Sequence, residues 1–280
     1  MSKVYVFPGQ GSQAIGMGAE LFDKYTDLVA QADEVLGYSI KELCLEGPIE
    51  KLSQTQYTQP ALYIVNALTY LDKIDNGGET PAFTAGHSLG EYNALFAAGV
   101  FDFITGLKLV QKRGEIMSKV EGGGMAAVLG MDAETIKQTL AAANLDKVDV
   151  ANFNSPKQTV LSGMKEDVVA AESAFKEAGA KRYIVLPVSG AFHSRYMEAP
   201  QAEFTEFAAQ FEFNAPQIPV ISNINATPYE ADAILPTLAA QISSSVRWVE
   251  SIQYIKTQGE FEFEELGPGK VLAGLVRQIS

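Results

Sequence analysis

Ser88 is the residue of this 280-residue chain best placed to act as a nucleophile. It stands in Gly86-His87-Ser88-Leu89-Gly90-Glu91, after a strand-like stretch over 81–85 and before an amphipathic run over 89–98. A strand, a tight turn and a helix make up a nucleophile elbow, in which small residues beside the serine permit the turn. The N–H groups that open the helix then face a developing oxyanion. Alone, the pattern fits a helix-capping turn equally well.

The chain contains only two histidines that could take a proton from this serine. Imidazole is the usual base near neutral pH, and consecutive side chains diverge in a tight turn, which leaves His87 badly placed. His193, in Gly190-Ala191-Phe192-His193-Ser194, is therefore favoured as the base over the alternative of an ordinary loop histidine. No acidic residue is marked as the third member of a triad, so we predict a Ser-His dyad whose imidazole is held by a backbone carbonyl.

An arginine shares an apolar stripe on a helix predicted over 103–120, with Asp102 as its N-cap. Leu109, Arg113 and Met117 are spaced i, i+4, i+8. A guanidinium there needs an anionic partner or a route to water, and pairing with a nearby carboxylate of the chain is one solution. Its planar fork also suits bidentate binding of a carboxylate on a substrate.

Composition describes a globular chain with ample core, at 47% hydrophobic and 20% charged residues. No apolar run approaches the ~20 residues of a membrane span, and the amino terminus leads into a strand without a signal peptide. A single cysteine, Cys44, fits a reducing, cytoplasmic location. The net charge of −13 argues against nucleic acid and anionic membranes as partners. No cluster of side chains has metal-ligand spacing, so we expect no metal.

The order of predicted elements places one compact unit inside the chain. Gly122-Gly123-Gly124 looks like a hinge, and a βαββαβ series, typical of a ferredoxin-like unit, follows it. The series comprises strand 125–129, helix 133–143, strands 148–153 and 159–162, helix 165–178 and strand 181–186. Other predicted elements are strand 4–7, helices 18–36, 59–73 and 198–211, strand 220–224, helices 236–242 and 251–258, and strand 261–266.

Taken together, the chain resembles the malonyl-CoA:acyl-carrier-protein transacylases over nearly its whole length. The resemblance is carried, in order, by Phe7-Pro8-Gly9-Gln10-Gly11-Ser12-Gln13, Gly86-His87-Ser88-Leu89-Gly90-Glu91, Gln111-Lys112-Arg113-Gly114, Gly190-Ala191-Phe192-His193-Ser194 and Gly267-Pro268-Gly269-Lys270-Val271-Leu272. It implies an α/β fold with an α/β-hydrolase-like core, built on a parallel sheet, and an inserted ferredoxin-like subdomain. The expected domains are 1–123 with 188–280 for the core and 124–187 for the insert.

The resemblance also assigns roles to single residues. Ser88 would carry the acyl group as an ester, and His193 would act as base and then acid. The backbone N–H groups of Gln10 and Leu89 would form the oxyanion hole, and Arg113 would bind the free carboxylate of a malonyl group. Further residues expected at the substrate are Met117, Phe192, Asn154, His87 and Arg247.

Two of these assignments carry a specific expectation. The ring of Phe192 would crowd an α-methyl group and so favour malonyl over methylmalonyl. Arg247 belongs to the segment before Trp248, whose main-chain carbonyls are expected to orient His193.

The implied reaction is ping-pong transfer from malonyl-CoA to the phosphopantetheine thiol of an acidic acyl carrier protein, with no bound cofactor and the enzyme as a monomer. Basic residues on either side of His193 in the sequence are candidates for carrier docking. They are Lys181, Arg182, Arg195, Arg247, Lys256 and Lys270. Fatty-acid synthesis and polyketide synthesis by a discrete, trans-acting acyltransferase both stay open. So do an acyl hydrolase that clears stalled carriers and a docking module with a decayed site.

Overall fold

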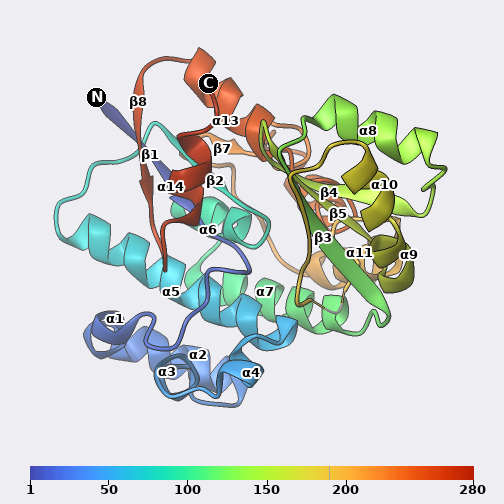
Figure 1. The fold of residues 1–280 in the computed structure, drawn as a ribbon. Helices are drawn as coiled ribbons and strands as arrows, with labels where there is room; N and C mark the ends of the chain where they lie inside the picture. The colour runs from blue at the N-terminus through green and yellow to red at the C-terminus, as the bar shows by residue number, and fades with distance from the viewer. Residues whose placement is uncertain (189) are drawn as a thin grey trace.

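The structure, a computed structural model, describes residues 1–188 and 190–280 and has two separate four-stranded sheets (Figure 1). Its elements in chain order are β1 (Ser2–Phe7), α1 (Ala19–Lys24), α2 (Thr26–Leu36), α3 (Ile40–Leu45), α4 (Ile49–Leu52), α5 (Thr55–Asp75), β2 (Phe83–Gly86), α6 (Gly90–Ala97), α7 (Phe103–Ser118), β3 (Gly123–Leu129), α8 (Ala133–Ala142), β4 (Val148–Ser155), β5 (Gln158–Met164), α9 (Lys165–Ala170), α10 (Glu172–Glu177), β6 (Arg182–Val185), the 3-10 helix η1 (Arg195–Met197), α11 (Glu198–Ala208), β7 (Val220–Ile221), α12 (Ile234–Ala240), α13 (Trp248–Thr257), β8 (Phe261–Glu265) and α14 (Val271–Val276).

The parallel sheet has the order β7-β2-β1-β8 and is covered by helices on both faces. Alternate residues of β1 point to opposite faces, as strand geometry requires. Val4 and Val6 pack in the core with α13 and α14, whereas Tyr5 and Phe7 join the larger core formed with α5, α6 and α7. Such two-sided burial explains why the first strand reads as a continuous apolar run.

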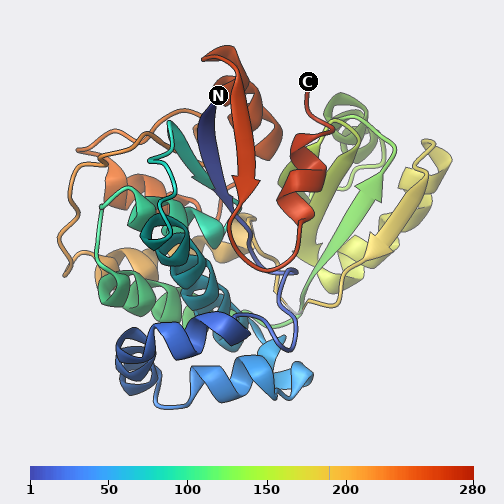
Figure 2. The same cartoon turned by 90° about the vertical axis from the view of Figure 1, so that its left-hand side faces the viewer.

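The antiparallel sheet has the order β4-β5-β3-β6 and carries α8, α9 and α10 on one face. Ala126 and Val128 of β3 face these helices, and Met125 and Ala127 face the main core. The predicted βαββαβ order is therefore confirmed, with the helix predicted over 165–178 divided at Ala171. Helix α14 lies between the two sheets, in contact with β8 and β4 (Figure 2).

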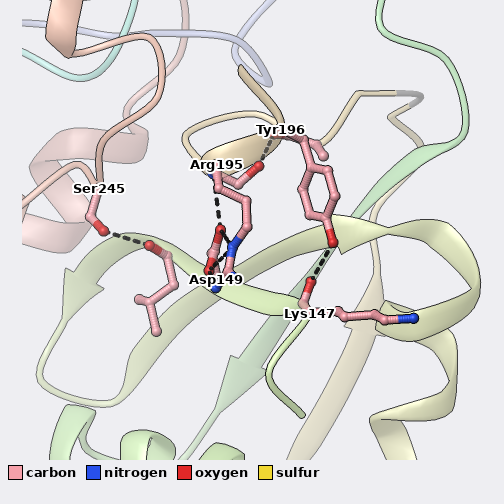
Figure 3. Close-up of polar contacts among 8 residues, drawn as sticks. Lys147, Asp149, Arg195, Tyr196 and Ser245 are labelled. Carbon is pink, nitrogen blue, oxygen red and sulfur yellow. Dashed lines mark hydrogen bonds and ion pairs between the residues drawn. The ribbon is translucent and has the colours of Figure 1, made fainter. Parts of the chain in front are cut away.

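Strand β4 also has a backbone partner outside its own sheet. The segment that ends at Val246 runs beside β4 as an isolated parallel bridge, in which the Val246 N–H donates to Ala151 O at 2.8 Å and the Phe153 N–H donates to Val246 O at 2.9 Å. Arg195 binds Asp149 of the same strand, and the Tyr196 hydroxyl donates to the carbonyl oxygen of Lys147, the residue just before β4 (Figure 3).

Several expectations from sequence need correction. The predicted hinge is wrong for two of its three glycines, because Gly123 and Gly124 pair with β5 as the start of β3. A Cβ at Gly123 would lie 2.2 Å from the N of Ala191, so this glycine permits close packing of two backbones. The helix predicted over 18–36 divides at Tyr25, and the strand predicted over 220–224 is only Val220–Ile221.

Short helices α3, α4 and α14 were not predicted, since each spans too few residues to show a 3.6-residue period. No helix within the described residues is long and apolar enough to cross a membrane.

The packing of the first turn of α6 predicts a large effect of one methyl group. A Cβ at Gly90 would lie 2.0 Å from the carbonyl oxygen of Phe7, whereas a Cβ at Gly274, in α14, meets nothing within 4 Å. We expect Gly90→Ala to lower the free energy of unfolding in urea by about 3 kcal/mol or more. Gly274→Ala is the matched control and should raise it by up to ~1 kcal/mol. Equal values for the two variants would contradict the close approach of α6 to β1.

Candidate active site

The turn that carries Ser88 is held by close backbone packing and by one asparagine. Cβ atoms at Gly86 and Gly90 would each lie within 2.0 Å of backbone atoms, so only glycine fits on either side of the serine. Ser88 has a φ of 52°, in the left-handed region that a side chain disfavours. Asn223 stabilises this conformation, since its Oδ1 accepts from the Ser88 N–H at 2.7 Å and its Nδ2 donates to Gly86 O at 2.7 Å.

The Ser88 hydroxyl lies beside the imidazole of His193, with 2.7 Å between Oγ and Nε2. On the other side of the ring, Nδ1 lies 2.9 Å from Gln241 O and 3.1 Å from Ser244 O. Carbonyl oxygens only accept, so Nδ1 carries the proton and Nε2 is left to accept from the serine. Burial, together with the charge of Arg113, lowers the pKa of His193 to about 3, which keeps the imidazole neutral.

We had expected the carbonyls that orient His193 at Arg247, but the structure places them elsewhere. The Arg247 N–H donates to Asn223 O, its guanidinium donates to Ile224 O, and it pairs with Glu250. One carbonyl comes from Ser244, which does lie in the segment shortly before Trp248. The other comes from Gln241, the residue that caps the end of α12.

Arg113 brings a buried positive charge to the same hydroxyl. Its side chain is 1% exposed; Nη2 donates to Ser88 Oγ at 3.1 Å and to Gln241 Oε1 at 2.9 Å, and Nη1 donates to Gln59 Oε1 at 2.7 Å. Its guanidinium also lies over the ring of Tyr92, 5.6 Å from the centroid. Within the described residues no carboxylate pairs with it directly, and its Nε has no partner. The fork is thus held by neutral acceptors, and no carboxylate of the described residues neutralises its charge.

A buried carboxylate fixes the amide that touches Arg113. Gln241 Nε2 donates to Glu91 Oε2 at 2.6 Å and to Ser88 O at 2.8 Å, which turns Oε1 toward the guanidinium. Glu91 also accepts from the Tyr229 hydroxyl. Burial raises the pKa of Glu91 to about 7, against the effect of these hydrogen bonds. The side chain and the main chain of Gln241 therefore serve Arg113 and His193 together.

A cavity of about 170 Å³ lies at these groups, between the two sheets. It is lined by nearly all the residues expected from sequence, namely Gln10, His87, Ser88, Leu89, Arg113, Met117, Asn154, Phe192 and His193. The His87 ring turns away from Ser88, with Nε2 at 2.7 Å from Asn154 Oδ1. Arg247 lies outside this cavity and lines another surface depression.

The backbone N–H groups of Gln10 and Leu89 are the free donors at this cavity. In residues 1–188 and 190–280 neither N–H donates to another group of the protein, although both residues line the cavity. Both are therefore candidate donors to a carbonyl oxygen placed in the cavity. In the same parts of the chain, no three His, Cys, Asp or Glu side chains are grouped to hold a metal ion.

Reasoning from sequence missed the polar residues that support the site: Gln59, Glu91, Asn223 and Gln241. A weak signal existed for two of them. Glu91 ends the serine motif, and Gln241 is a polar residue closing an apolar helix. Gln59 and Asn223 carry no local signal, because their partners lie far away in the sequence.

Comparison with known proteins gives consistent matches over the whole length. The family model described as "Acyl transferase domain" matches residues 4–273. The "Polyketide biosynthesis malonyl CoA-acyl carrier protein transacylase BaeC" of Bacillus velezensis is 56% identical over 278 residues, which cover 98% of this chain and 96% of that protein.

Solved structures agree with this match. The malonyl CoA-acyl carrier protein transacylase of Burkholderia pseudomallei has a TM-score of 0.96 at 50% identity, covering 100% of this chain and 98% of that one. "PlMCAT:AntF (holo)", a type II polyketide-synthase acyl-carrier protein in complex with its malonyl-transacylase, has a TM-score of 0.95 at 39% identity, covering 100% and 93%.

The lowered pKa of His193 predicts how the reactivity of Ser88 depends on pH. A neutral imidazole accepts the serine proton, so the rate of sulfonylation by phenylmethylsulfonyl fluoride should show no downturn near pH 6.5, the ordinary pKa of histidine. The rate should fall only as the pH approaches about 3. Because the folded pKa of His193 lies below the unfolded one, its contribution to the free energy of unfolding is complete above about pH 6.5 and is lost as the pH falls toward 3. Glu91, whose folded pKa is raised to about 7, contributes with the opposite sign, so the two effects on unfolding are separated by repeating the titration in Glu91→Gln. A half-maximal rate near pH 6.5 would contradict the buried dyad.

Proposed function

The chain belongs to the malonyl CoA-acyl carrier protein transacylase family, and we propose that its malonyl transfer proceeds through an ester on Ser88. The enzyme transfers malonyl groups from malonyl-CoA to an acyl carrier protein. The observation that carries the proposed mechanism is the convergence on one hydroxyl of His193 Nε2 at 2.7 Å and Arg113 Nη2 at 3.1 Å. A general base and a cation for the free carboxylate thus meet at the proposed nucleophile.

In the first half-reaction, His193 accepts the proton of Ser88 as Oγ attacks the thioester carbonyl of malonyl-CoA. The carbonyl oxygen becomes an oxyanion, which accepts hydrogen bonds from the backbone N–H groups of Gln10 and Leu89. The carbon–sulfur bond then breaks, and the CoA sulfur takes the proton from His193. The product is malonyl-Ser88 with free CoA, and His193 is neutral again.

The second half-reaction is the reverse sequence with another thiol. His193 accepts the proton of the phosphopantetheine thiol of the carrier, whose sulfur attacks the ester carbonyl. The same N–H groups stabilise the second oxyanion. The bond from the carbonyl carbon to Oγ breaks, and Ser88 recovers its proton from His193. Malonyl leaves as a thioester of the carrier.

Arg113 is proposed to select the acyl group in two ways. Its fork binds the malonyl carboxylate, and an acetyl group would leave this buried charge unpaired. The same charge lowers the pKa of His193, so an imidazolium is costly while Arg113 has no anion beside it. A bound carboxylate offsets that charge, which makes proton transfer to His193 easier. Phe192 lines the cavity and is proposed to exclude an α-methyl group.

We infer further that the parallel sheet is an α/β-hydrolase-like core of residues 1–123 and 188–280, and that 124–187 form a ferredoxin-like insert. The strand order β4-β5-β3-β6 with helices on one face supports the second inference. A CoA substrate and a free, buried cysteine support a cytoplasmic location. We propose that the reaction needs no bound cofactor, because Ser88 and His193 supply the nucleophile and the base.

We propose polyketide synthesis as the pathway, with the enzyme acting as a discrete partner of the synthase. The support is the 56% identity to a polyketide-biosynthesis transacylase over 98% of this chain. Loading rates on a polyketide-synthase carrier and on a fatty-acid carrier would decide between the two.

Intact-mass measurement tests the covalent step. Brief exposure to malonyl-CoA without a carrier should add one malonyl group to the protein, and Ser88→Ala should abolish this addition. Ser173→Ala, an exposed serine of α10, is the control and should label fully. Rapid thioester loss to water with no adduct would instead favour an acyl hydrolase, and no reaction at all would favour a docking module.

Substitution of the buried arginine tests selectivity. Arg113→Ala should lower the rate of malonyl loading at subsaturating malonyl-CoA by roughly 100-fold or more, because the carboxylate loses its buried partner. Acetyl loading should be unchanged or faster, since the charge that opposes protonation of His193 is gone. Arg277→Ala, at an exposed position after α14, is the matched control. Equal losses for both acyl groups would show that Arg113 is only structural.

A further inference from the structure

The two segments that hold the catalytic imidazole are both attached to strand β4. One segment contains His193 itself and continues into η1. The other, residues 243–246, supplies the Ser244 carbonyl that accepts from Nδ1. Figure 3 shows both beside the first half of β4, with polar contacts from Arg195, Tyr196 and Ser245.

Asp149 on β4 makes the densest of these contacts. Its carboxylate accepts the backbone N–H of Arg195 at 2.9 Å, Nε of the same residue at 3.0 Å, and also Nη2. The Asp149 side chain is only 20% exposed. Although burial opposes it, the hydrogen bonds from Arg195 hold the pKa of Asp149 below its usual value. One carboxylate thus fixes both the main chain and the side chain of a residue two positions after His193.

The second segment is attached a residue or two further along β4. Ser245 Oγ donates to Val150 O at 2.5 Å, and the Val246 N–H donates to Ala151 O at 2.8 Å. Because Ser244 precedes these residues, the position of its carbonyl follows from the position of β4.

His193 needs such support because its backbone is unfavourable. Its φ is 56°, a left-handed conformation that persists only where surrounding contacts impose it. Ser194 contributes a local bond, from Oγ to Ala191 O, but this bond lies within the same segment. The contacts from Asp149 connect the segment to a separate sheet.

We propose that Asp149 is a positioning residue for proton transfer, which holds the His193 segment on β4 so that Nε2 meets Ser88 Oγ while Nδ1 meets the carbonyl from the neighbouring segment. The inference rests on the proposed acyl-serine mechanism. It gives the antiparallel sheet a part in catalysis besides lining the cavity. It also assigns Arg195 a structural partner, whereas the sequence had suggested Arg195 for carrier docking.

The test is the single-turnover rate of Ser88 acylation by malonyl-CoA, without any carrier protein. Asp149→Ala should lower this rate by roughly 10- to 100-fold, since a displacement of about 1 Å at a reacting group has effects of that size. Asp149→Asn still accepts the Arg195 N–H and should retain more of the rate. The apparent affinity for malonyl-CoA should stay unchanged, because Arg113 is held by residues of other elements.

Asp132→Ala is the control for loss of a surface ion pair. Asp132 caps α8 on the same sheet unit and pairs with Lys157 at 3.3 Å, away from His193. If both variants lose similar stability but only Asp149→Ala loses acylation rate, the positioning role stands. Wild-type rates in Asp149→Ala, or equal rate losses in the two variants, would overturn it.

A pH profile adds a readout that stability alone does not move. Burial, Arg113 and His87 hold the pKa of His193 low, and a loosened segment would admit water. The acid limb of the Asp149→Ala profile should therefore move up toward 6.5, the ordinary value for histidine. An unchanged limb together with an unchanged rate would contradict the inference. Absence of any adduct on the wild-type protein would instead contradict the proposed function.

Discussion

A positive charge buried next to the reacting hydroxyl is the constraint on which the site depends. Arg113 is removed from water and has no directly paired carboxylate among the described residues. Removing a charge from water is costly, and the protein offsets part of this cost with neutral acceptors on Gln59 and Gln241. Glu91 does not contact Arg113 directly, because the side-chain amide of Gln241 lies between them. A carboxylate in direct contact would compete with the malonyl carboxylate that Arg113 is proposed to bind. On that proposal, the arrangement favours the bound substrate over the empty site.

The end of α12 is subject to the same constraint. Its last turn ends at Gln241, whose side chain meets Arg113 and whose carbonyl meets His193. The cation and the base are thus held by one residue at a fixed separation. Because both groups bind the same hydroxyl, a shift of α12 would disturb the two roles proposed for them, acyl selection and proton transfer, at the same time.

The central residues of the site were predictable because each has a local signature. Ser88 lies in a glycine-flanked turn, His193 follows by elimination, and Arg113 interrupts an apolar stripe. Gln59 and Asn223 were not predictable, since an amide residue has no distinctive pattern and its role depends on partners that only the fold brings near. The carbonyls that orient His193 were expected close to Arg247 and lie at Gln241 and Ser244, because main-chain acceptors leave no trace in side-chain identity.

For the fold too, features with a local sequence pattern were predictable and features that depend on distant partners were not. Local periodicity predicted the βαββαβ order, but strand order and the contact between the sheets depend on long-range pairing. Glycine is ambiguous at this level: Gly123 suggested a flexible joint, whereas the structure uses it for close approach of β3 to the chain before His193.

The position of the cavity around Ser88 has a consequence for the direction of the reaction. On the proposed mechanism the acyl end of the thioester lies in this cavity, and donor and acceptor both present a pantetheine arm at its opening. Inside the cavity, loading from the donor and transfer to the acceptor are then the same reaction in opposite directions. The two thioesters that are exchanged have similar free energies of hydrolysis. Net flux is then governed by the relative supply of the two thiols, and discrimination between them is left to the outer surface, where nucleotide and carrier differ.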